Sequence, residues 1–532
     1  KLIELYLGID LGTTNTVASV KEEGKKDITT LISNSGSRLI KSIAHFGKSK
    51  IEIGEDALDF IEEDPLNTFY STKRLIGKSL EEIDKNVLKN LSYKVINNTE
   101  GQLSLECPNQ KNLIPVQVVS SEIIKGVLKI FYEFYSPKEY ILKNIVITVP
   151  AYFNHNQRKA TLEAAALAGI SEVDIINEPS AAAIAYGNIQ QKSSNIIVFD
   201  IGGGTFDMSL VNYDGDGFWD IVGSYGDDVL GGDDFDNIIS DIITKKCKLN
   251  FNDIKISDEG LGIIRNLAKQ YKEKFSLKSK NEYKINLPNI GIFEDKTISP
   301  IIEITKKEFE DSSEKLIKRI ESKIKEFLDF PEIKNQEFNK IILVGGSSRI
   351  PLFRELIYQI TKNKLSNNNN INPDEAVSIG AAKYAEYRSK GLVKISDVTP
   401  LNLGTTILEN IFDIIVPMNS KIPLEYTRPY TTLSDFQEYI QFDVRQGNRE
   451  LSSENSLLGE FILDGISPMP AGEAELEGTI KIDSNGILTA EATDLKTKKT
   501  RKIIIQNYQR LSRKEILKLK AQADKYKNED DK

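Results

Sequence analysis

Two glycine-rich segments of the sequence carry residues that could hold a phosphate group. The first, DLGTTN at 10–15, and the second, DIGGGTFD at 200–207, each follow an apolar run and precede another one. Each segment therefore predicts a turn between two strands, with an aspartate at the end of the first strand. Glycines without a Cβ leave backbone N–H groups open to an anion, so both turns could cradle a phosphate.

A single glycine triplet between strands would also fit an ordinary hairpin. The repetition of the same order of residues favours a duplicated fold, with a ligand held between its two halves. A Walker-type phosphate loop requires G-x-x-x-x-G-K-[ST] before a helix, and the sequence contains no such segment.

The segments that must position these turns alternate between strands and helices. Apolar strands are expected at 138–150 and 340–344. Alanine content and a spacing of 3.6 residues predict helices around them, so we expect a mixed or parallel sheet in each half. The predicted helices cover residues 156–169, 177–187, 257–277, 306–328 and 373–389.

The pattern changes after Gly391. From 397 to 506, short runs of alternating apolar and polar residues, separated by turns, predict an all-β sandwich. Residues 511–527 return to a helical pattern, in which Ser512 is the expected N-cap and Glu515 stands three residues later.

Composition limits the classes of function. The net charge of −9 argues against nucleic acid as a main partner, because phosphate contacts require clustered Lys and Arg. Cys107 and Cys247 fit a reducing compartment, and two histidines, His45 and His155, argue against a histidine-based zinc site or catalytic triad. No apolar run approaches the roughly 20 residues that span a bilayer, and no basic-then-apolar leader opens the chain. We therefore expect a cytoplasmic protein without membrane contact.

GIDLGTTN at 8–15 and DIGGGTFD at 200–207 resemble the phosphate loops of the DnaK-type heat shock chaperones (the heat shock protein 70 family), members of the actin and sugar-kinase superfamily. The resemblance runs from the first strand to about residue 525. Further blocks match the family in the same order: KRLIG at 73–77, TVPAYF at 148–153, NEPSAAA at 177–183, LGGDDFD at 230–236, VGGSSRIP at 344–351 and DVTPL at 397–401.

The resemblance implies an α/β two-lobed actin-like ATPase domain, an all-β sandwich peptide-binding domain and a short α-helical stub. The expected boundaries are 1–390 for the ATPase domain, 391–396 for the interdomain linker, 397–507 for the sandwich and 508–532 for a truncated helical lid. The implied function is that of an ATP-dependent molecular chaperone. Such a protein binds extended apolar peptides and couples their release to ATP binding and hydrolysis.

The resemblance also assigns roles to individual residues. Lys73, Glu178 and Thr205 would orient the attacking water, with Asp207 beside them. Asp10 and Asp200, at opposing strand ends, suit hydrated Mg²⁺, a hard cation that retains several waters. ATP or ADP would be held by Gly12, Thr13, Thr14, Asn15, Gly202, Gly203, Gly204 and Thr205 at its phosphates, and by Lys272, Ser276, Gly345, Gly346, Ser347 and Arg349 at its adenosine.

Two of these residues have simpler interpretations. Without the resemblance, Lys73 would be a solvated surface lysine. Glu178, which precedes a proline, would be a favourable negative charge at a helix N-terminus.

In the sandwich, the family binds an extended peptide through backbone hydrogen bonds and one deep apolar pocket. Ordinary sandwich core is the alternative for Phe442 and Leu476, whereas Leu408 and Leu433 stand on loop-like stretches. The matching positions are Ile407, Leu408, Tyr430, Leu433, Ile440, Phe442 and Leu476.

The sequence departs from the family pattern at three places. Lys269 replaces the usual Glu one turn before Lys272, which affects the expected ribose contacts. The linker LVKISD at 392–397 carries Lys394 and Ser396 where leucines are usual, and burying them in an apolar groove would weaken the coupling of ATP to peptide. Ala471 stands where an Arg would latch the lid.

Several blocks, GDDFD at 232–236, GNREL at 447–451 and PAG at 470–472, resemble the HscA branch, which serves iron–sulfur cluster assembly. A general DnaK-type folding chaperone is the alternative. The expected partners are unfolded or extended peptides, a J-domain co-chaperone, a nucleotide-exchange factor and an iron–sulfur scaffold protein. A small-molecule kinase of the same superfamily, or a nucleotide-binding scaffold without turnover, are the remaining hypotheses.

Overall fold

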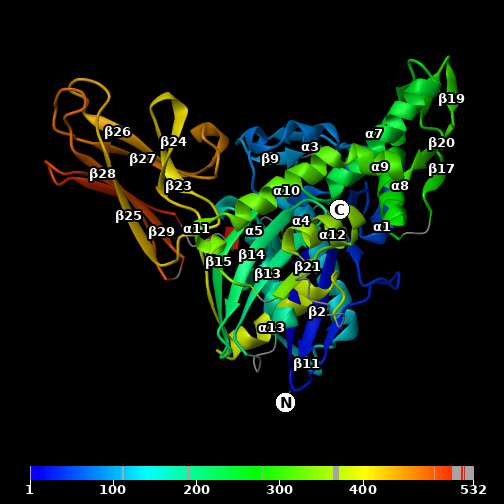
Figure 1. Ribbon diagram of the computed structural model, residues 1–532, viewed down its shortest axis with the longest axis horizontal. Coiled ribbons are helices and arrows are strands. Elements are labelled where there is room, and N and C mark those ends of the chain that lie inside the picture. Colours follow the sequence, from blue (N-terminus) through cyan, green and yellow to red (C-terminus); the bar gives the residue numbers. More distant parts are fainter. Residues whose placement is uncertain are drawn as a thin grey trace.

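The structure is a computed structural model (Figure 1). The expected lid at 508–532 lies outside the described residues, except for Lys514, Leu517, Lys518 and Ala521, which are helical. The longer described segments are 2–110, 113–187, 192–277, 280–338, 340–362, 371–484 and 486–505.

The first glycine-rich turn joins two neighbouring strands of a six-stranded sheet, which we call the first sheet. Its strand order is β12-β11-β1-β2-β3, with β4 also paired to β2. β1 runs antiparallel to β2 across the turn and parallel to β11 on its other side. The strands are β1 (Ile3–Leu11), β2 (Asn15–Glu22), β3 (Ile28–Thr30), β4 (Ile40–Lys41), β11 (Tyr140–Val149) and β12 (Asp174–Asn177).

The second turn occupies the same place in a second sheet, whose order is β21-β13-β14-β15-β22. β13 is antiparallel to β14 and parallel to β21, so the pairing around the turn repeats that of the first sheet. The predicted duplication and the mixed sheets are therefore confirmed. The strands are β13 (Ser194–Ile201), β14 (Phe206–Tyr213), β15 (Phe218–Asp227), β21 (Lys340–Val344) and β22 (Lys394–Ser396).

Two alanine-rich helices, α6 (Glu178–Tyr186) and α13 (Ala376–Ser389), cross each other closely between the sheets. A Cβ on Gly380 of α13 would lie 1.7 Å from the carbonyl oxygen of Ala181 on α6, so only glycine fits at that crossing. Although α13 follows β21 of the second sheet along the chain, it packs on β1, β2 and β11 of the first sheet. Ser378 Oγ lies 2.7 Å from Ser19 Oγ of β2. The chain thus returns to the first sheet before it enters the linker.

Smaller sheets and further helices surround the two central sheets. The helices α4 (Val116–Phe134) and α5 (His155–Leu167) contribute side chains to the apolar core of the first sheet. The helices α7 (Gly232–Asn250) and α8 (Asp258–Ser276) lie side by side and extend away from the second sheet (Figure 1). The remaining helices are α1 (Glu55–Leu58), α2 (Phe60–Glu63), α3 (Lys85–Lys89), α9 (Lys306–Ser312), α10 (Glu314–Leu328), α11 (Pro331–Lys334) and α12 (Pro351–Thr361). The remaining strands of this part are β5 (Ala44–Phe46), β6 (Ile51–Ile53), β7 (Thr68–Phe69), β8 (Val95–Asn97), β9 (Leu103–Leu105), β10 (Ile114–Pro115), β16 (Lys255–Ile256), β17 (Glu282–Asn286), β18 (Gly291–Phe293), β19 (Lys296–Ile298) and β20 (Ile301–Thr305).

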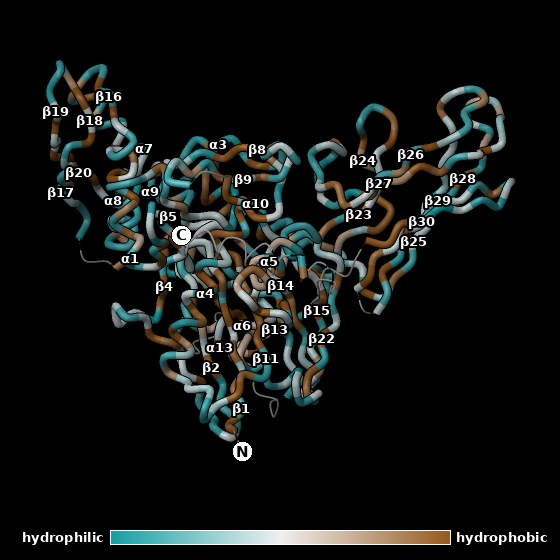
Figure 2. Tube along the Cα trace, turned by 180° about the vertical axis from the view of Figure 1, so that it is seen from behind, coloured by the Kyte–Doolittle hydropathy of each residue, from teal (hydrophilic) through white to brown (hydrophobic). Residues whose placement is uncertain are grey.

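The central strands are the most hydrophobic part of this region, and the surrounding loops are mainly polar (Figure 2). The two sheets have separate apolar cores, and a third cluster, which includes the alanines of α6 and α13, fills the space between them. In the part of the chain that the structure describes, no helix combines the length and the apolar character that crossing a membrane requires.

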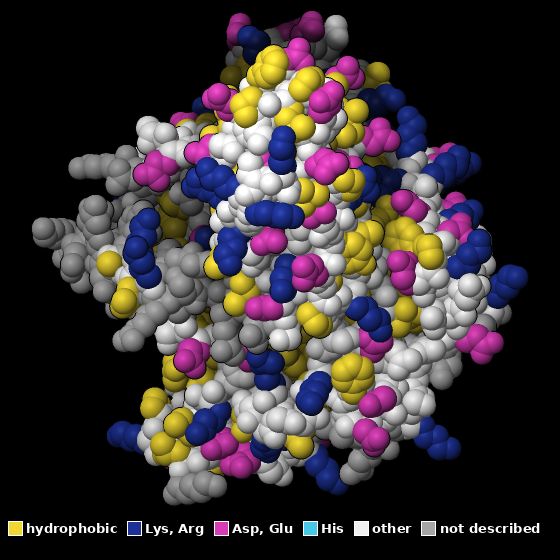
Figure 3. All heavy atoms as spheres, turned by 90° about the vertical axis from the view of Figure 1, so that its left-hand side faces the viewer, with side chains coloured by type: hydrophobic (Ala, Val, Ile, Leu, Met, Phe, Trp, Pro, Cys, Tyr) yellow, Lys and Arg dark blue, Asp and Glu magenta, His cyan; other side chains and the backbone are white. Residues whose placement is uncertain are grey.

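The C-terminal region consists of two four-stranded antiparallel sheets, of order β24-β23-β26-β27 and β25-β28-β29-β30. Their inward-facing side chains share one core, as the alternating sequence pattern predicts. Figure 3 looks onto this end of the molecule, where hydrophobic side chains stand among charged ones. The strands are β23 (Leu403–Ile407), β24 (Ile411–Val416), β25 (Leu424–Tyr430), β26 (Tyr439–Gln446), β27 (Ser456–Asp464), β28 (Leu476–Ile482), β29 (Leu488–Asp494) and β30 (Thr500–Ile505).

The crossing of α6 and α13 gives a direct test of the packing. Gly380→Ala should destabilise the protein by about 1–3 kcal/mol, the usual cost of overpacking a tight contact. The measurement is the urea midpoint of unfolding. Ser389→Ala, on the exposed end of the same helix, is the matched control and should leave the midpoint nearly unchanged. Equal midpoints for the wild type and Gly380→Ala would contradict the contact.

Candidate functional site

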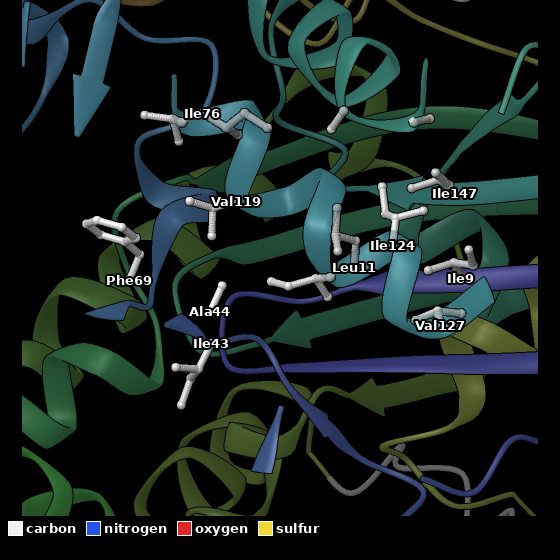
Figure 4. Close-up of a cluster of buried hydrophobic side chains, with 14 of the residues drawn as sticks. Ile9, Leu11, Ile43, Ala44, Phe69, Ile76, Val119, Ile124, Val127 and Ile147 are labelled. Carbon is white, nitrogen blue, oxygen red and sulfur yellow. The ribbon is translucent and has the colours of Figure 1, made fainter. Parts of the chain in front are cut away.

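The two glycine-rich turns face each other closely. A Cβ on Gly203 would lie 2.0 Å from Thr14 Oγ1, and one on Gly204 would lie 2.7 Å from Thr13 Oγ1. Glycine is therefore required in the second turn because the first turn approaches it. The first turn is held from behind by the core of the first sheet, where Ile9 and Leu11 of β1 lie in one cluster with side chains of α4 (Figure 4).

A buried ion pair lies beside the turns. Lys73, in a short 3₁₀ helix (Thr72–Arg74), places Nζ 2.5 Å from Glu178 Oε1 at the start of α6. The side chains are 10% and 6% exposed, so the interpretation of Lys73 as a surface lysine is wrong. Burial alone would lower the pKa of Lys73, but Glu178 and Asp10 raise it above its ordinary value. Lys73 thus carries a positive charge inside the site.

Three aspartates lie close enough to Glu178 to feel its charge. Burial, and next the charge of Glu178, raise the pKa of Asp10 to about 7. The same two causes, in the same order, raise the pKa of Asp200 and of Asp207 well above the ordinary value. With Lys73 as the close cation, the site holds an excess of carboxylates that are costly to ionise without a further positive charge.

The residues fit a hydrated divalent cation. Asp10 Oδ1 accepts a hydrogen bond from Thr148 Oγ1 at 3.3 Å, and Asp207 Oδ1 accepts one from the Tyr152 backbone N–H at 3.2 Å. Asp207 Oδ2 and Asn15 Oδ1 are buried without a hydrogen-bond partner among the described residues. Across those same residues, no three Asp, Glu, His or Cys side chains are grouped closely enough to bind a metal by themselves. The carboxylates of Asp10 and Asp200 are the ligand type that Mg²⁺ takes together with waters and phosphate oxygens.

The residues expected at the adenosine lie at the far end of the second turn. Ser347 Oγ donates to the Gly202 carbonyl at 3.0 Å. Lys272 Nζ lies 2.7 Å from Asp236 Oδ1 and donates to the Gly232 carbonyl at 3.2 Å. Gly345 has φ +84°, and a Cβ there would meet the Ile201 carbonyl at 2.4 Å. These residues of α8, α7 and the segment after β21 therefore border the second turn.

Arg349 and Ser276 lie at the edges of this group. Arg349 Nη2 donates to Asn372 Oδ1 at 3.0 Å and lies 2.8 Å from Asp374 Oδ2, with its side chain 51% exposed. Ser276 Oγ donates to the Lys272 carbonyl at 3.1 Å, within its own helix. The remaining glycines, Gly12 and Gly346, lie in the first turn and in the segment after β21.

Sequence reasoning missed a second ionic group beside the turns. Arg74 is buried, and its Nη2 lies 2.7 Å from Asp234 Oδ2. Its Nε donates to the Gly204 carbonyl at 3.3 Å, and Ser71 Oγ donates to Asp233 Oδ2 at 2.5 Å. These bonds join the start of α7 to the first half. The signal was present in the blocks KRLIG and LGGDDFD, but their spacing gives no indication that they meet.

The linker forms β22, the edge strand of the second sheet. It pairs in parallel with β15, with Trp219 opposite Ile395 and Asp220 opposite Ser396. Lys394 points to solvent, and the Ser396 hydroxyl donates to the Asp220 carboxylate. Lys394 and Ser396 thus avoid an apolar groove in this structure, and the weaker coupling of ATP to peptide stays a prediction.

The sandwich contacts the first half directly. Asn154 Nδ2 donates to Ser456 Oγ at 2.8 Å, and the His155 backbone N–H donates to Gln446 Oε1 at 2.7 Å. Asn154 also caps α5, a helix whose start is therefore tied to β26 and β27. The linker strand and this interface connect the sandwich to both halves.

The residues expected to bind peptide divide into two groups. Ile407, Leu408 and Leu433 are 39%, 59% and 65% exposed. Phe442 and Leu476 are buried in the sandwich core, as the alternative interpretation had it. Tyr430 and Ile440 are half-buried between the groups. Three apolar side chains thus face solvent above a filled core.

The family profile and the similar proteins agree with one another over nearly the whole chain. The profile of the family described as "Hsp70 protein" matches residues 6–532. "Chaperone protein dnaK" of Cyanidium caldarium is 35% identical over 532 residues, which cover 99% of this chain and 84% of that protein. The protein of the same name from Guillardia theta is 36% identical over 529 residues, covering 98% and 82%. "Heat shock 70 kDa protein 7, chloroplastic" of Arabidopsis thaliana is 34% identical over 537 residues, covering 99% and 72%.

These comparisons contradict the expected cytoplasmic location. Both Arabidopsis relatives, heat shock 70 kDa proteins 6 and 7, are named as chloroplastic. A reducing environment and the absence of an apolar leader do not distinguish the cytoplasm from the interior of an organelle, so the sequence argument was too weak for this conclusion.

The raised pKa of Asp10 predicts how stability depends on pH. Because the folded pKa is about 7 and the ordinary value is 3.8, the folded state binds more protons between these values. The free energy of unfolding of the ligand-free protein should therefore fall as the pH rises from about 4 to 7, by at most about 4 kcal/mol from this group. Asp10→Asn should flatten that dependence and stabilise the protein at pH 8. Parallel stability curves for the wild type and the variant would contradict the predicted shift.

The linker contact predicts a second outcome. Asp220→Ala removes the acceptor for Ser396 and should release β22 from β15, because a hydrogen bond to a charged group contributes roughly 1.5–3 kcal/mol. Trypsin cleavage after Lys394 should then accelerate about tenfold or more. Asp216→Ala, an exposed change on the turn between β14 and β15, is the matched control. Unchanged cleavage in Asp220→Ala would show that other contacts hold the linker.

Proposed function

Because the chain belongs to the Hsp70 family, whose members are ATPases and chaperones, we propose that it is a general ATP-dependent chaperone for extended apolar peptides. The observation that carries the proposal is the buried Lys73–Glu178 pair beside two glycine turns that approach within van der Waals distance. The turns present backbone N–H groups to phosphates. The Lys73–Glu178 pair supplies an ordered cation and a carboxylate beside the position of the terminal phosphate.

In this proposal the turns hold the β- and γ-phosphates. As the bond to the leaving oxygen breaks, its electron pair goes to that oxygen, and the negative charge of the γ-phosphoryl group is spread over its three equatorial oxygens, where Lys73 stabilises it. Glu178, held by Lys73, and Thr205, in the second turn, orient the water in line with the leaving oxygen. When bound, Mg²⁺ would be held through waters by Asp10 and Asp200 and would neutralise phosphate charge.

The proposed adenosine site is formed by Gly345, Gly346, Ser347, Arg349, Lys272 and Ser276, which border the second turn. The half-exposed Arg349 is free on one face to cover a base, while its other face is fixed by Asp374. We assign 1–390 to the ATPase domain in two lobes, 391–396 to the linker, 397–507 to the peptide-binding sandwich and 508–532 to the lid.

The proposed peptide site lies where Leu408 and Leu433 stand exposed above the sandwich core. Phe442 and Leu476, which are buried in the sandwich core, would lie beneath this site and would not contact the peptide at the surface. The pairing of the linker strand with β15 and the contacts of α5 with β27 support coupling between ATP and peptide. Each of these two contacts would change if one half moved against the other. Peptide clients, a J-domain co-chaperone and an exchange factor are the proposed partners.

Two alternatives are less well supported. The DnaK-type and Hsp70 relatives favour a general folding role over iron–sulfur cluster assembly. A small-molecule kinase would not explain the sandwich and its attachment through β22. Transfer of phosphate from ATP to a sugar would be the observation in favour of the kinase.

The catalytic proposal is tested by Lys73→Ala. Single-turnover hydrolysis should fall by about 10²–10³, the scale for removing one preorganised charge-stabilising donor, while ATP binding is largely retained. Lys85→Ala, an exposed lysine at the start of α3, is the control. A normal rate of hydrolysis in Lys73→Ala would refute the assigned role.

A further inference from the structure

A buried histidine of the first half lies between two carboxylates. His45, on β5, stands directly opposite Glu52 of β6 in the small sheet β6-β5-β7. Its Nδ1 lies 2.9 Å from Glu52 Oε2, and its Nε2 lies 2.9 Å from Oδ2 of Asp64, the residue that follows α2. The side chain of His45 is 6% exposed, so the ring depends on these two partners rather than on water.

This arrangement requires a positively charged ring. Asp64 also accepts hydrogen bonds from the side-chain amides of Asn67 and Asn109, at 2.7 and 3.0 Å. Burial alone would raise the pKa of Glu52 and of Asp64, but hydrogen bonds from neighbouring side chains, His45 among them, hold each pKa below its ordinary value. Two ionised carboxylates can only accept, so both ring nitrogens must donate, and an imidazole with two N–H groups is a cation.

Two further titratable groups lie near this histidine and its carboxylates. Lys50 Nζ lies 3.0 Å from Glu52 Oε1, but the lysine side chain is 74% exposed, so water screens its charge. Burial raises the pKa of the Cys107 thiol to about 11, which keeps the thiol neutral near neutral pH. Phe60 of α2 covers one face of the histidine ring, with the ring centres 3.8 Å apart. The ring therefore has an apolar face and two charged edges.

The same contacts hold α2 at both of its ends. The histidine ring stacks on Phe60, the first residue of α2, and binds the side chain of Asp64, which ends the helix. Thr68 Oγ1, on β7, lies within hydrogen-bond distance of the Phe60 and Asp64 carbonyls, at 3.0 and 2.8 Å. A helix of four residues is not stable by itself, so the position of α2 depends on these neighbours.

α2 is also a place where the first half meets α8 of the second half. Gly262 of α8 approaches so closely that a Cβ would lie 2.2 Å from the Ile61 carbonyl. Asn266 Nδ2, one turn later, donates to Glu62 Oε1 at 2.9 Å. Ile61 and Glu62 are the central residues of α2. A shift of α2 would therefore break the contact between the halves at this point.

We propose that His45 is a pH-sensitive clamp, which holds α2 against α8 while its ring is charged and releases α2 when the ring gives a proton to water. A neutral ring has one N–H group and one lone pair, so one of the two carboxylates would face a lone pair. A buried acceptor without a donor is costly. The inference concerns the contact of α2 with α8 and does not depend on the proposed function.

Asp64 is the partner that the neutral ring should lose. Its side chain is 33% exposed, whereas that of Glu52 is 11% exposed and stands on a paired strand. Asp64 can therefore turn toward water at a smaller cost. Since Asp64 ends α2, its movement frees that end of the helix and loosens the contact with α8.

The direction of the pH effect follows from linkage between closure and protonation. Only the closed contact offers the ring two ionised acceptors, so closure and the ring proton favour each other. The clamp should therefore open as the pH rises through the range in which histidine changes charge, ordinarily about pH 5–8. In acid, below the lowered pKa values of Glu52 and Asp64, protonation of these acceptors should weaken it as well.

The test measures hydrogen exchange in the full chain between about pH 6 and about pH 9. Amide protection, corrected for the intrinsic pH dependence of exchange, is compared for α2 and for residues 262–266 of α8. The helix α10, which packs on α12 and β15, is the internal reference. The proteins are the wild type, His45→Gln and Glu52→Gln. His155→Gln, which removes the other histidine of the chain, is the matched control.

The clamp predicts a different profile for each protein. In the wild type and in His155→Gln, protection of α2 and of residues 262–266 should fall by about tenfold or more as the pH rises, the scale for one hydrogen bond to a charged group. Protection of α10 should stay constant. His45→Gln should show low protection at every pH. Glu52→Gln should stay protected at high pH, because its amide can donate to the lone pair of a neutral ring.

Three outcomes overturn the inference. Constant protection of α2 in the wild type shows that the charge of the ring does not hold the helix. A fall of the same size in His45→Gln assigns the pH dependence to other groups, and a parallel fall in α10 assigns it to unfolding of the whole domain. If circular dichroism shows that His45→Gln is unfolded, the wild type and Glu52→Gln decide, and equal pH dependence in these two overturns the clamp.

Discussion

The site depends on the crowding of four buried carboxylates around one ammonium group. Asp10 comes from the first sheet, Asp200 and Asp207 come from the second, and Glu178 begins α6. Lys73 neutralises part of their charge. Such an arrangement is costly in the folded protein, and it persists because the sheets on either side are fully packed. In the proposed function, this unbalanced charge favours a ligand that brings its own cation. The proposed phosphate site uses the close approach of the two turns, which places backbone donors on both sides of one space.

The two halves are held together by few but specific contacts. α6 and α13 cross where Gly380 removes the last side-chain atom between them, and Arg74 joins the start of α7 to the first half. Between these contacts, an apolar cluster that includes the alanines of α6 and α13 fills the space between the two sheets. Movement of one half against the other would therefore change the second turn, α8 and the linker strand together, which would connect the proposed nucleotide site with the sandwich.

Local patterns in the sequence predicted the duplicated turns, the mixed sheets and the sandwich, because strand–turn–strand segments are defined by neighbouring residues. Contacts between distant segments could not be read in this way. The burial of Lys73 depends on α6, more than a hundred residues later, and the return of α13 to the first sheet depends on its fit against Ala181. The linker shows the same limit: the types of Lys394 and Ser396 suggested a cost of burial, but in a strand one of them faces solvent and the other meets Asp220. For the proposed peptide site, the resemblance to the family identified which residues to consider. It could not predict that Leu408 is exposed and that Leu476 is buried.

The linker strand has a further role at the edge of its sheet. β22 pairs with Phe218, Trp219 and Asp220 of β15, so the linker covers the backbone donors and acceptors of this part of the edge. An uncovered edge of this kind is a template on which any extended chain can add a strand, including a second copy of the same protein. A protein that handles unfolded chains is surrounded by such segments. Covering β15 with its own linker therefore protects the molecule from self-association and from capture by the chains it is meant to bind elsewhere.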